Sequence, residues 1–120
     1  MSERPIVVIV EDEEDSREIL KELLEYHGHR VRTAANGQEA LALLDELGDR
    51  ACVMLLDLFM PVLDGWQVYE QLQARGMLGT VAVLITTSAP HRAPAGAAVL
   101  EKPVDIPRLL EILEERCAER

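Results

Sequence analysis

The chain has 120 residues, of which 48% are hydrophobic and 28% are charged, and its formal net charge is -10 at pH 7. These values are typical of a soluble globular protein, so we expect residues 1–120 to form a single domain. The negative charge argues against nucleic-acid binding, because phosphates would be repelled. The longest apolar run, Ala51 to Leu56, is too short to span a membrane, and no basic segment precedes an apolar leader. We therefore expect a cytoplasmic protein with no membrane partner.

The first half of the chain predicts two strand and helix pairs. Residues 6–10 predict a buried strand, and residues 16–27 predict an amphipathic helix that Gly28 ends. Residues 31–34 predict a weaker strand, followed by a helix that Asn36 caps and that ends near Gly48.

The second half continues the same alternation. Residues 51–56 predict a strand buried on both faces, residues 65–75 a helix, and residues 81–85 a fourth strand. Residues 98–101 predict a fifth strand, and Asp105 caps a last helix. This order predicts an α/β fold, with a mainly parallel sheet and helices on both faces.

Polar side chains stand where the predicted strands end. Glu11 and Asp12 follow the first strand, Asp57 ends the third, Thr86 ends the fourth and Lys102 ends the fifth. Ligands of such folds collect outside the carboxyl ends of the strands, so we expect these five side chains to converge.

Carboxylates held this close raise one another's pKa unless a cation joins them. Mg²⁺ is the cation expected to bind there, because it takes oxygen ligands from one or two carboxylates and from a phosphate. Together with a lysine and a hydroxyl, such a site can neutralise a transferring phosphoryl group. Asp57 is then the expected nucleophile, since carboxylates form aspartyl phosphates.

Four segments in this order, "VIVEDEEDSREIL", "MLLDLFMPVLDG", "VLITT" and "LEKPVD", resemble the receiver domain of two-component response regulators, the CheY-like superfamily. The resemblance covers nearly the whole chain. It implies a flavodoxin-like, doubly wound sheet of five parallel strands in the order 2-1-3-4-5. It also implies a phosphoacceptor signalling domain, not an enzyme, which takes its phosphoryl group from a histidine kinase or a phosphotransfer protein.

The resemblance also assigns roles to individual residues. Asp57 would accept the phosphoryl group and bind Mg²⁺, Asp12 would bind the metal directly, and Glu11 would bind it through water. The backbone carbonyl of Phe59 would complete the protein ligands. Lys102 would pair with the acids and then with the phosphoryl group, and its peptide bond to Pro103 is expected to be cis.

The switch hydroxyl is ambiguous, because Thr86 and Thr87 are adjacent. Thr86 is the expected switch residue if the fourth strand ends at Ile85, and Thr87 is the fallback.

The segment between the fourth strand and Lys102 departs from the family pattern. Only 15 residues, "TSAPHRAPAGAAVLE", must hold a loop, a helix and the fifth strand, and an average helix alone takes about 11 residues. Pro90 and Pro94 also stand where this helix would begin and continue. We therefore predict that the helix between the fourth and fifth strands is missing or reduced to one turn. Val99 replaces the family's aromatic residue, so partner contacts are expected at the first or the last helix instead.

Cys52 and Cys117 show no metal-ligand spacing. We expect two reduced, partly buried thiols, with a disulfide as the minor alternative.

Two other functions stay open. The first is a receiver-like interaction module that signals without phosphorylation, which the shortened segment favours and the five intact site residues oppose. The second is a phosphatase with Asp57 as nucleophile. Phosphatases of that kind carry a second acid two residues later, where this chain has Phe59. The sequence names no kinase or downstream partner and leaves homodimer formation open.

Overall fold

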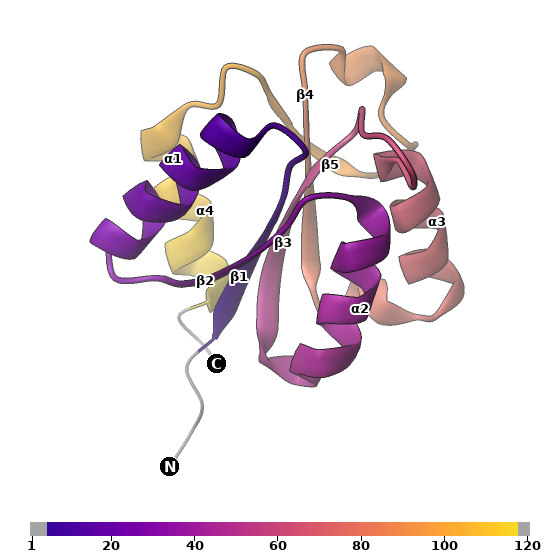
Figure 1. Ribbon diagram of the computed structural model, residues 1–120, viewed down its shortest axis with the longest axis horizontal. Helices are drawn as coiled ribbons and strands as arrows, with labels where there is room; N and C mark the ends of the chain where they lie inside the picture. The colour runs from indigo at the N-terminus through magenta and orange to yellow at the C-terminus, as the bar shows by residue number, and fades with distance from the viewer. Residues whose placement is uncertain (1–4, 118–120) are drawn as a thin grey trace.

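The computed structural model describes residues 5–117 and contains a five-stranded parallel sheet (Figure 1). The strand order is β2-β1-β3-β4-β5, as the sequence predicts. The strands are β1 (Ile6–Val10), β2 (Arg30–Ala34), β3 (Ala51–Asp57), β4 (Ala82–Thr87) and β5 (Ala98–Glu101). Every residue of β3 is buried, because this strand is central and both of its faces are covered. Its apolar run therefore reflects burial on both faces.

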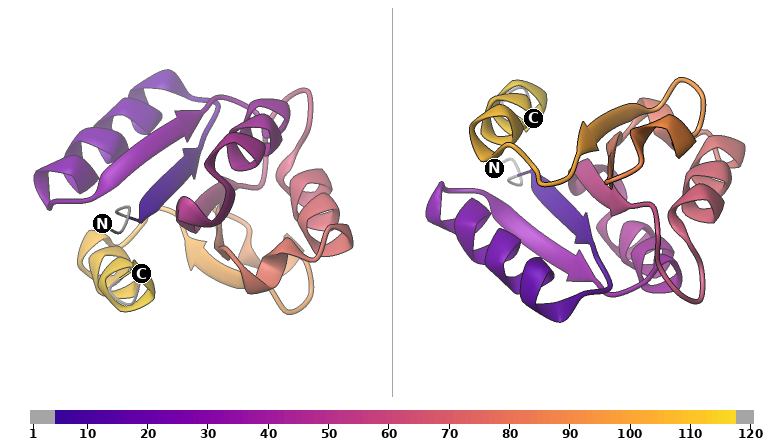
Figure 2. Two further views of the ribbon diagram at one scale, coloured as in Figure 1. Left: turned by 90° about the horizontal axis from the view of Figure 1, so that it is seen from below. Right: turned by 90° about the horizontal axis from the view of Figure 1, so that it is seen from above.

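Two helices cover each face of the sheet (Figures 1 and 2). Helices α1 (Glu14–Tyr26) and α4 (Ile106–Cys117) pack on one face through Leu24, Leu109 and Leu113. Helices α2 (Gly37–Leu47) and α3 (Gly65–Ala74) pack on the other, with Leu44 and Leu72 among their buried residues. None of the helices within residues 5–117 is long and apolar enough to cross a bilayer.

Polar side chains fix the helix starts. The Asn36 side chain accepts a hydrogen bond from the backbone N–H of Glu39 at 2.9 Å, and Asp105 accepts one from Arg108 at 3.2 Å. Both predicted caps are therefore confirmed. Helix α1 begins two residues earlier than predicted, because Glu13 caps it by accepting from the backbone N–H of Ser16.

The connection from β4 to β5 contains a three-residue 3-10 turn, Pro90–Arg92, in place of a helix. The prediction that this helix is missing or reduced to one turn is confirmed. The helix called α4 is therefore the one that follows β5. The turn is anchored on α3, because the indole N–H of Trp66 donates to the backbone carbonyl of Arg92 at 2.8 Å. The Arg92 guanidinium also lies 5.2 Å from the ring centre of Phe59 and 5.3 Å from that of Trp66.

The expectation of two reduced thiols is wrong, because the structure joins Cys52 and Cys117 in a disulfide. Cys52 lies near the start of β3, Cys117 is the last residue of α4, and their Cα atoms are 5.7 Å apart. The two cysteines are separated by 65 residues, so only the packing of α4 on the sheet brings them together.

Candidate functional site

The predicted site residues gather at the carboxyl edge of the sheet. Side chains alternate between the two faces of a strand. The face that packs against α1 and α4 carries Val7, Ile9, Val53, Leu55, Leu84 and Leu100. Counting forward by two residues along each strand places four polar residues on this same face: Glu11, Asp57, Thr86 and Lys102.

Three carboxylates meet at this edge. Ligand oxygens of Glu11, Asp12 and Asp57 all lie within 4.8 Å of one another. Asp57 is the last residue of β3 and is 5% exposed, whereas Asp12 is exposed in the loop before α1. The predicted convergence of the acids therefore occurs.

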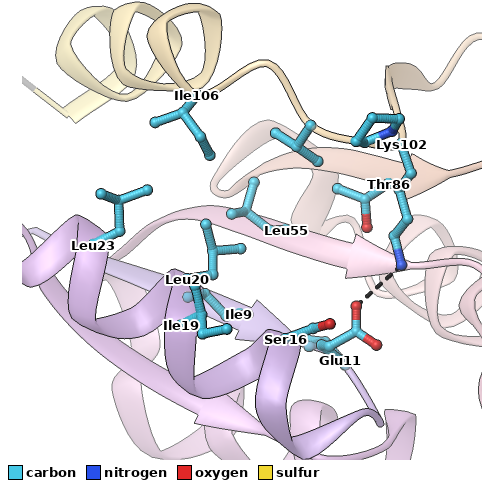
Figure 3. Close-up of a pocket in the computed structure, with 13 residues that line it drawn as sticks. Ile9, Glu11, Ser16, Ile19, Leu20, Leu23, Leu55, Thr86, Lys102 and Ile106 are labelled. Atoms are coloured by element: carbon cyan, nitrogen blue, oxygen red, sulfur yellow. Dashed lines mark hydrogen bonds and ion pairs between the residues drawn. The ribbon is translucent and has the colours of Figure 1, made fainter.

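Lys102 supplies the positive charge. Its ammonium nitrogen lies 3.1 Å from a carboxylate oxygen of Glu11 and 3.3 Å from one of Asp57. Figure 3 shows its side chain reaching from the end of β5 to Glu11. The peptide bond from Lys102 to Pro103 is cis, as expected.

The charges of the site perturb one another. Burial, and then the negative charge of Glu11, raise the pKa of Asp57 from 3.8 to about 6, although Lys102 and the backbone N–H of Phe59 oppose this shift. Burial alone would lower the pKa of Lys102, but its hydrogen bond to Glu11 and the charges of both acids raise it above its ordinary value. The site therefore carries an excess of negative charge that one lysine does not cancel.

The structure distinguishes the two threonines, although β4 ends at Thr87 and not at Ile85. Thr86 stands opposite Asp57 in the register of β3 and β4, and it lines the same cavity as Lys102 (Figure 3). Thr87 lies on the other face of β4, and its hydroxyl oxygen accepts a hydrogen bond from the backbone N–H of Ala89 at 3.0 Å. This placement favours Thr86 as the hydroxyl of the site.

The loop after Asp57 is held against the neighbouring strand β4 and against α3. The backbone N–H of Leu58 donates to Thr86 at 3.2 Å, and that of Gly65 donates to Leu58 at 2.9 Å. A Cβ atom at Gly65 would lie 2.6 Å from the backbone oxygen of Asp57, so a side chain does not fit there. The first residue of α3 therefore packs directly on the end of β3.

Two residues near the site were absent from the predicted set. The backbone N–H of Glu13 donates to the Glu11 carboxylate at 3.1 Å, and the guanidinium of Arg17 donates to the Glu11 backbone carbonyl at 2.9 Å. No sequence pattern indicates either contact, because Glu is not among the preferred N-cap residues and Arg17 lies on the predicted helix without a partner signal.

The donor set suits a hard divalent cation. Three carboxylates offer only oxygen ligands, and their mutual repulsion favours a cation among them. A thiolate or imidazole donor, which softer metals prefer, is not part of this cluster.

An apolar cavity of ≈ 360 Å³ adjoins the polar site. Figure 3 shows Ile19, Leu20 and Leu23 of α1 on one side of it and Ile106 of α4 on the other. Ile19 is 68% exposed and lines this cavity, so it extends the apolar lining to the protein surface. The cavity therefore offers an apolar surface within reach of the acids.

Known proteins share this sequence pattern. Residues 7–114 match the family described as the response regulator receiver domain. A response regulator receiver protein of Anaeromyxobacter sp. (strain Fw109-5) is 38% identical over 111 residues, which cover 88% of this chain and 45% of that protein. Protein PilH of Pseudomonas aeruginosa is 31% identical over 114 residues, which cover 89% of this chain and 93% of PilH. The chain thus spans less than half of the first relative and most of the second.

Solved structures share the fold. The receiver domain of the hybrid histidine kinase CckA is 32% identical, with a TM-score of 0.78 over 93% of this chain and 98% of that one. The response regulator TrrA of Thermotoga maritima, in complex with Mg(2+)-BeF, is 25% identical, with a TM-score of 0.79 over 92% of this chain and 97% of that one. Sequence and fold agree: this chain belongs to the response regulator receiver domain family.

Proposed function

We propose that the protein is the phosphoacceptor of a two-component phosphorelay and that Asp57 receives the phosphoryl group. The observation that carries this proposal is the convergence of Glu11, Asp12 and Asp57 within 4.8 Å, with the Lys102 ammonium 3.3 Å from Asp57. A structural neighbour, TrrA, is a complex with Mg(2+)-BeF, which adds support.

The reaction is a phosphoryl transfer to a carboxylate. A carboxylate oxygen of Asp57 forms a bond to phosphorus, while the bond from phosphorus to the donor breaks and the donor leaves with the electron pair. The pKa of about 6 leaves Asp57 ionised at neutral pH, so the nucleophile is available. Lys102 then exchanges its contact with the Asp57 carboxylate for the oxygens of the phosphoryl group.

The three acids would hold Mg²⁺, with Asp12 and Asp57 as direct ligands, Glu11 acting through water and the backbone carbonyl of Phe59 as the last protein ligand. The metal supplies charge neutralisation for the transferring group. Thr86 would donate a hydrogen bond to the phosphoryl group and so transmit the change in charge to β4.

A matched set of variants tests the chemistry. Incubation with Mg²⁺ and a small acyl phosphate is expected to add the mass of one phosphoryl group to the intact protein. Asp57→Asn is expected to abolish this gain, and Asp45→Asn, which changes an exposed acid on α2, is expected to retain it. An unmodified wild-type protein would favour a module that signals without phosphorylation.

The apolar cavity beside the acids is the proposed contact for the phosphodonor protein. A donor must bring its phosphohistidine to Asp57, and the exposed Ile19 stands on α1 at the rim of this cavity. Ile19→Asp is expected to slow transfer from a phosphorylated histidine kinase or phosphotransfer protein while leaving transfer from a small acyl phosphate unchanged. Tyr26→Ala, at the far end of α1, serves as the control. Equal loss with both donors would place the effect in the acid site, not in docking.

A further inference from the structure

The disulfide begins at an irregularity of β3. Ile6 of β1 pairs with Ala51, and the next residue, Val7, pairs with Val53, so Cys52 has no partner in β1. An extra residue of this kind is a β-bulge, which redirects a side chain. Cys52 accordingly lies in the same cluster as its neighbour Val53, on the face that α4 covers.

Disulfide formation fixes the last turn of α4. Leu109 and Leu113 are fully buried, but Glu114, Glu115 and Arg116 are exposed, and the next residue is Cys117. The bond from Cys117 to the buried Cys52 is therefore the covalent attachment of this turn to the sheet.

The structure accommodates the reduced state as well. The sulfur of Cys52 lies 3.4 Å from the backbone oxygen of Ile6, so a thiol at this position has an acceptor for its proton. Cys117 is only partly buried and lines a surface opening of ≈ 190 Å³ beside Gly28 and Leu113. A reagent from solution can thus reach Cys117, whereas Cys52 is 1% exposed.

We propose that Cys52 and Cys117 are a reversible dithiol–disulfide site that locks the C-terminal end of α4 to β3. This inference is independent of the phosphoacceptor function. The other end of α4 reaches the apolar cavity through Ile106, so the helix connects the redox pair with the surface beside the acids (Figure 3).

The reaction partner is a small disulfide such as oxidised glutathione. The Cys117 thiol loses its proton, and the thiolate attacks one sulfur of the small disulfide and expels one thiolate. Cys52, deprotonated in turn, attacks the Cys117 sulfur of the mixed disulfide and expels the second thiolate. Two protein thiols and one small disulfide thus give one protein disulfide and two small thiols.

Thiol labelling and amide hydrogen exchange test the proposal on the full chain. After treatment with oxidised glutathione, denaturation and alkylation, the intact mass is expected to show no alkyl label, and after treatment with dithiothreitol it is expected to show two. Reduction is expected to speed exchange in peptides from α4 by roughly tenfold, because the cross-link no longer restricts opening of the helix end. Amides of α2 that exchange through local opening are expected to keep their rates, because the cross-link does not restrict local opening on the other face of the sheet.

Cys117→Ala is the matched control, since it removes the cross-link at a partly exposed helix end and leaves the buried Cys52 in place. Its α4 exchange is expected to equal that of the reduced wild type under both conditions. Two alkyl labels after oxidation, a protein that retains bound glutathione, or disulfide-linked dimers would each overturn the proposal. Equal rates of α4 exchange in the oxidised and reduced wild type would contradict the claim that the disulfide holds the end of α4 against β3.

Discussion

The surroundings of Asp57 disfavour the ionised form of its carboxyl group. It is 5% exposed, and its pKa is raised from 3.8 to about 6 by burial and by Glu11. The folded protein therefore holds the Asp57 proton more tightly than the unfolded chain does. Between about pH 4 and pH 6 the unfolded state releases this proton first, so the free energy of unfolding falls as the pH rises through that interval.

Asp57→Asn is expected to make the metal-free protein more stable. At pH 7 the buried charge costs about 3 kcal/mol, from 1.36 kcal/mol for each unit of pKa shift, and the amide removes that cost. We expect a higher free energy of unfolding at pH 7, and a weaker dependence on pH between about 4 and 6, in urea titrations. Glu22→Gln, an exposed change on α1, is the control. A variant less stable than wild type at pH 7 would contradict the electrostatic account.

Val62, in the loop between β3 and α3, has a strained backbone conformation. Its φ angle is 70°, a left-handed conformation that is a true outlier for a β-branched residue. The backbone N–H of Leu63 donates to Pro61 across it at 2.8 Å, which is the hydrogen bond of a γ-turn. Val62 is 73% exposed, so little packing compensates for the strain.

Val62→Gly is expected to raise the free energy of unfolding by about 1 kcal/mol, since Gly has no Cβ and adopts a positive φ angle without a steric penalty. Val62→Ala also shortens the side chain but keeps the Cβ atom, so it is expected to give a smaller gain. Urea unfolding of the three proteins measures both changes. An unchanged stability of the Val62→Gly protein would mean that Val62 adopts this turn without strain.

At the scale of elements, the 3-10 turn Pro90–Arg92 stands where the sequence leaves no room for a helix. Phe59, Trp66 and Arg92 form a cluster that holds it, because the two rings meet edge to face at 5.1 Å and the guanidinium lies against both. The connection from β4 is thereby attached to the loop that follows Asp57. This cluster therefore joins the loop after β3, helix α3 and the surface turn between β4 and β5.

Arg92→Ala is expected to lower the free energy of unfolding by about 1 kcal/mol, the sum of two exposed cation–π contacts. Trp66 is the single tryptophan of the chain, so its fluorescence reports both the unfolding and the loss of the guanidinium from its ring. His91→Ala changes the exposed neighbour and is the control. Identical stability and emission in Arg92→Ala would mean that the contact is energetically neutral.

Local patterns predicted the elements better than they predicted contacts between them. The caps at Asn36 and Asp105 and the buried strand before Asp57 follow from neighbouring residues, so the sequence contains their signals. The choice between Thr86 and Thr87 required knowing which of the two side chains lies on the same face of β4 as the acids. The disulfide between Cys52 and Cys117 depends on a bulge in β3 and on the packing of α4, and the two cysteines are separated by 65 residues. Local periodicity in the sequence predicts neither feature.

At the scale of the whole molecule, the disulfide closes a loop that contains half of the chain. In the chain-entropy description, a cross-link across 65 residues stabilises the folded state by about 4 kcal/mol, because it restricts the unfolded chain. Reduction is therefore expected to lower the free energy of unfolding by up to this amount, and Cys117→Ala is expected to be insensitive to reductant. Urea titrations with and without dithiothreitol measure the difference. A change below about 1 kcal/mol would mean that the cross-link adds little to the packed core.

The central claim is that acids from separate strands form one site that directs a phosphoryl group to Asp57. Peptide mapping by mass spectrometry, after incubation with a small acyl phosphate, tests it most directly. We predict that the peptide containing Asp57 carries the phosphoryl group only when Mg²⁺ is present. A phosphoryl group on another residue, or equal labelling of Asp57 without a divalent cation, would contradict the account.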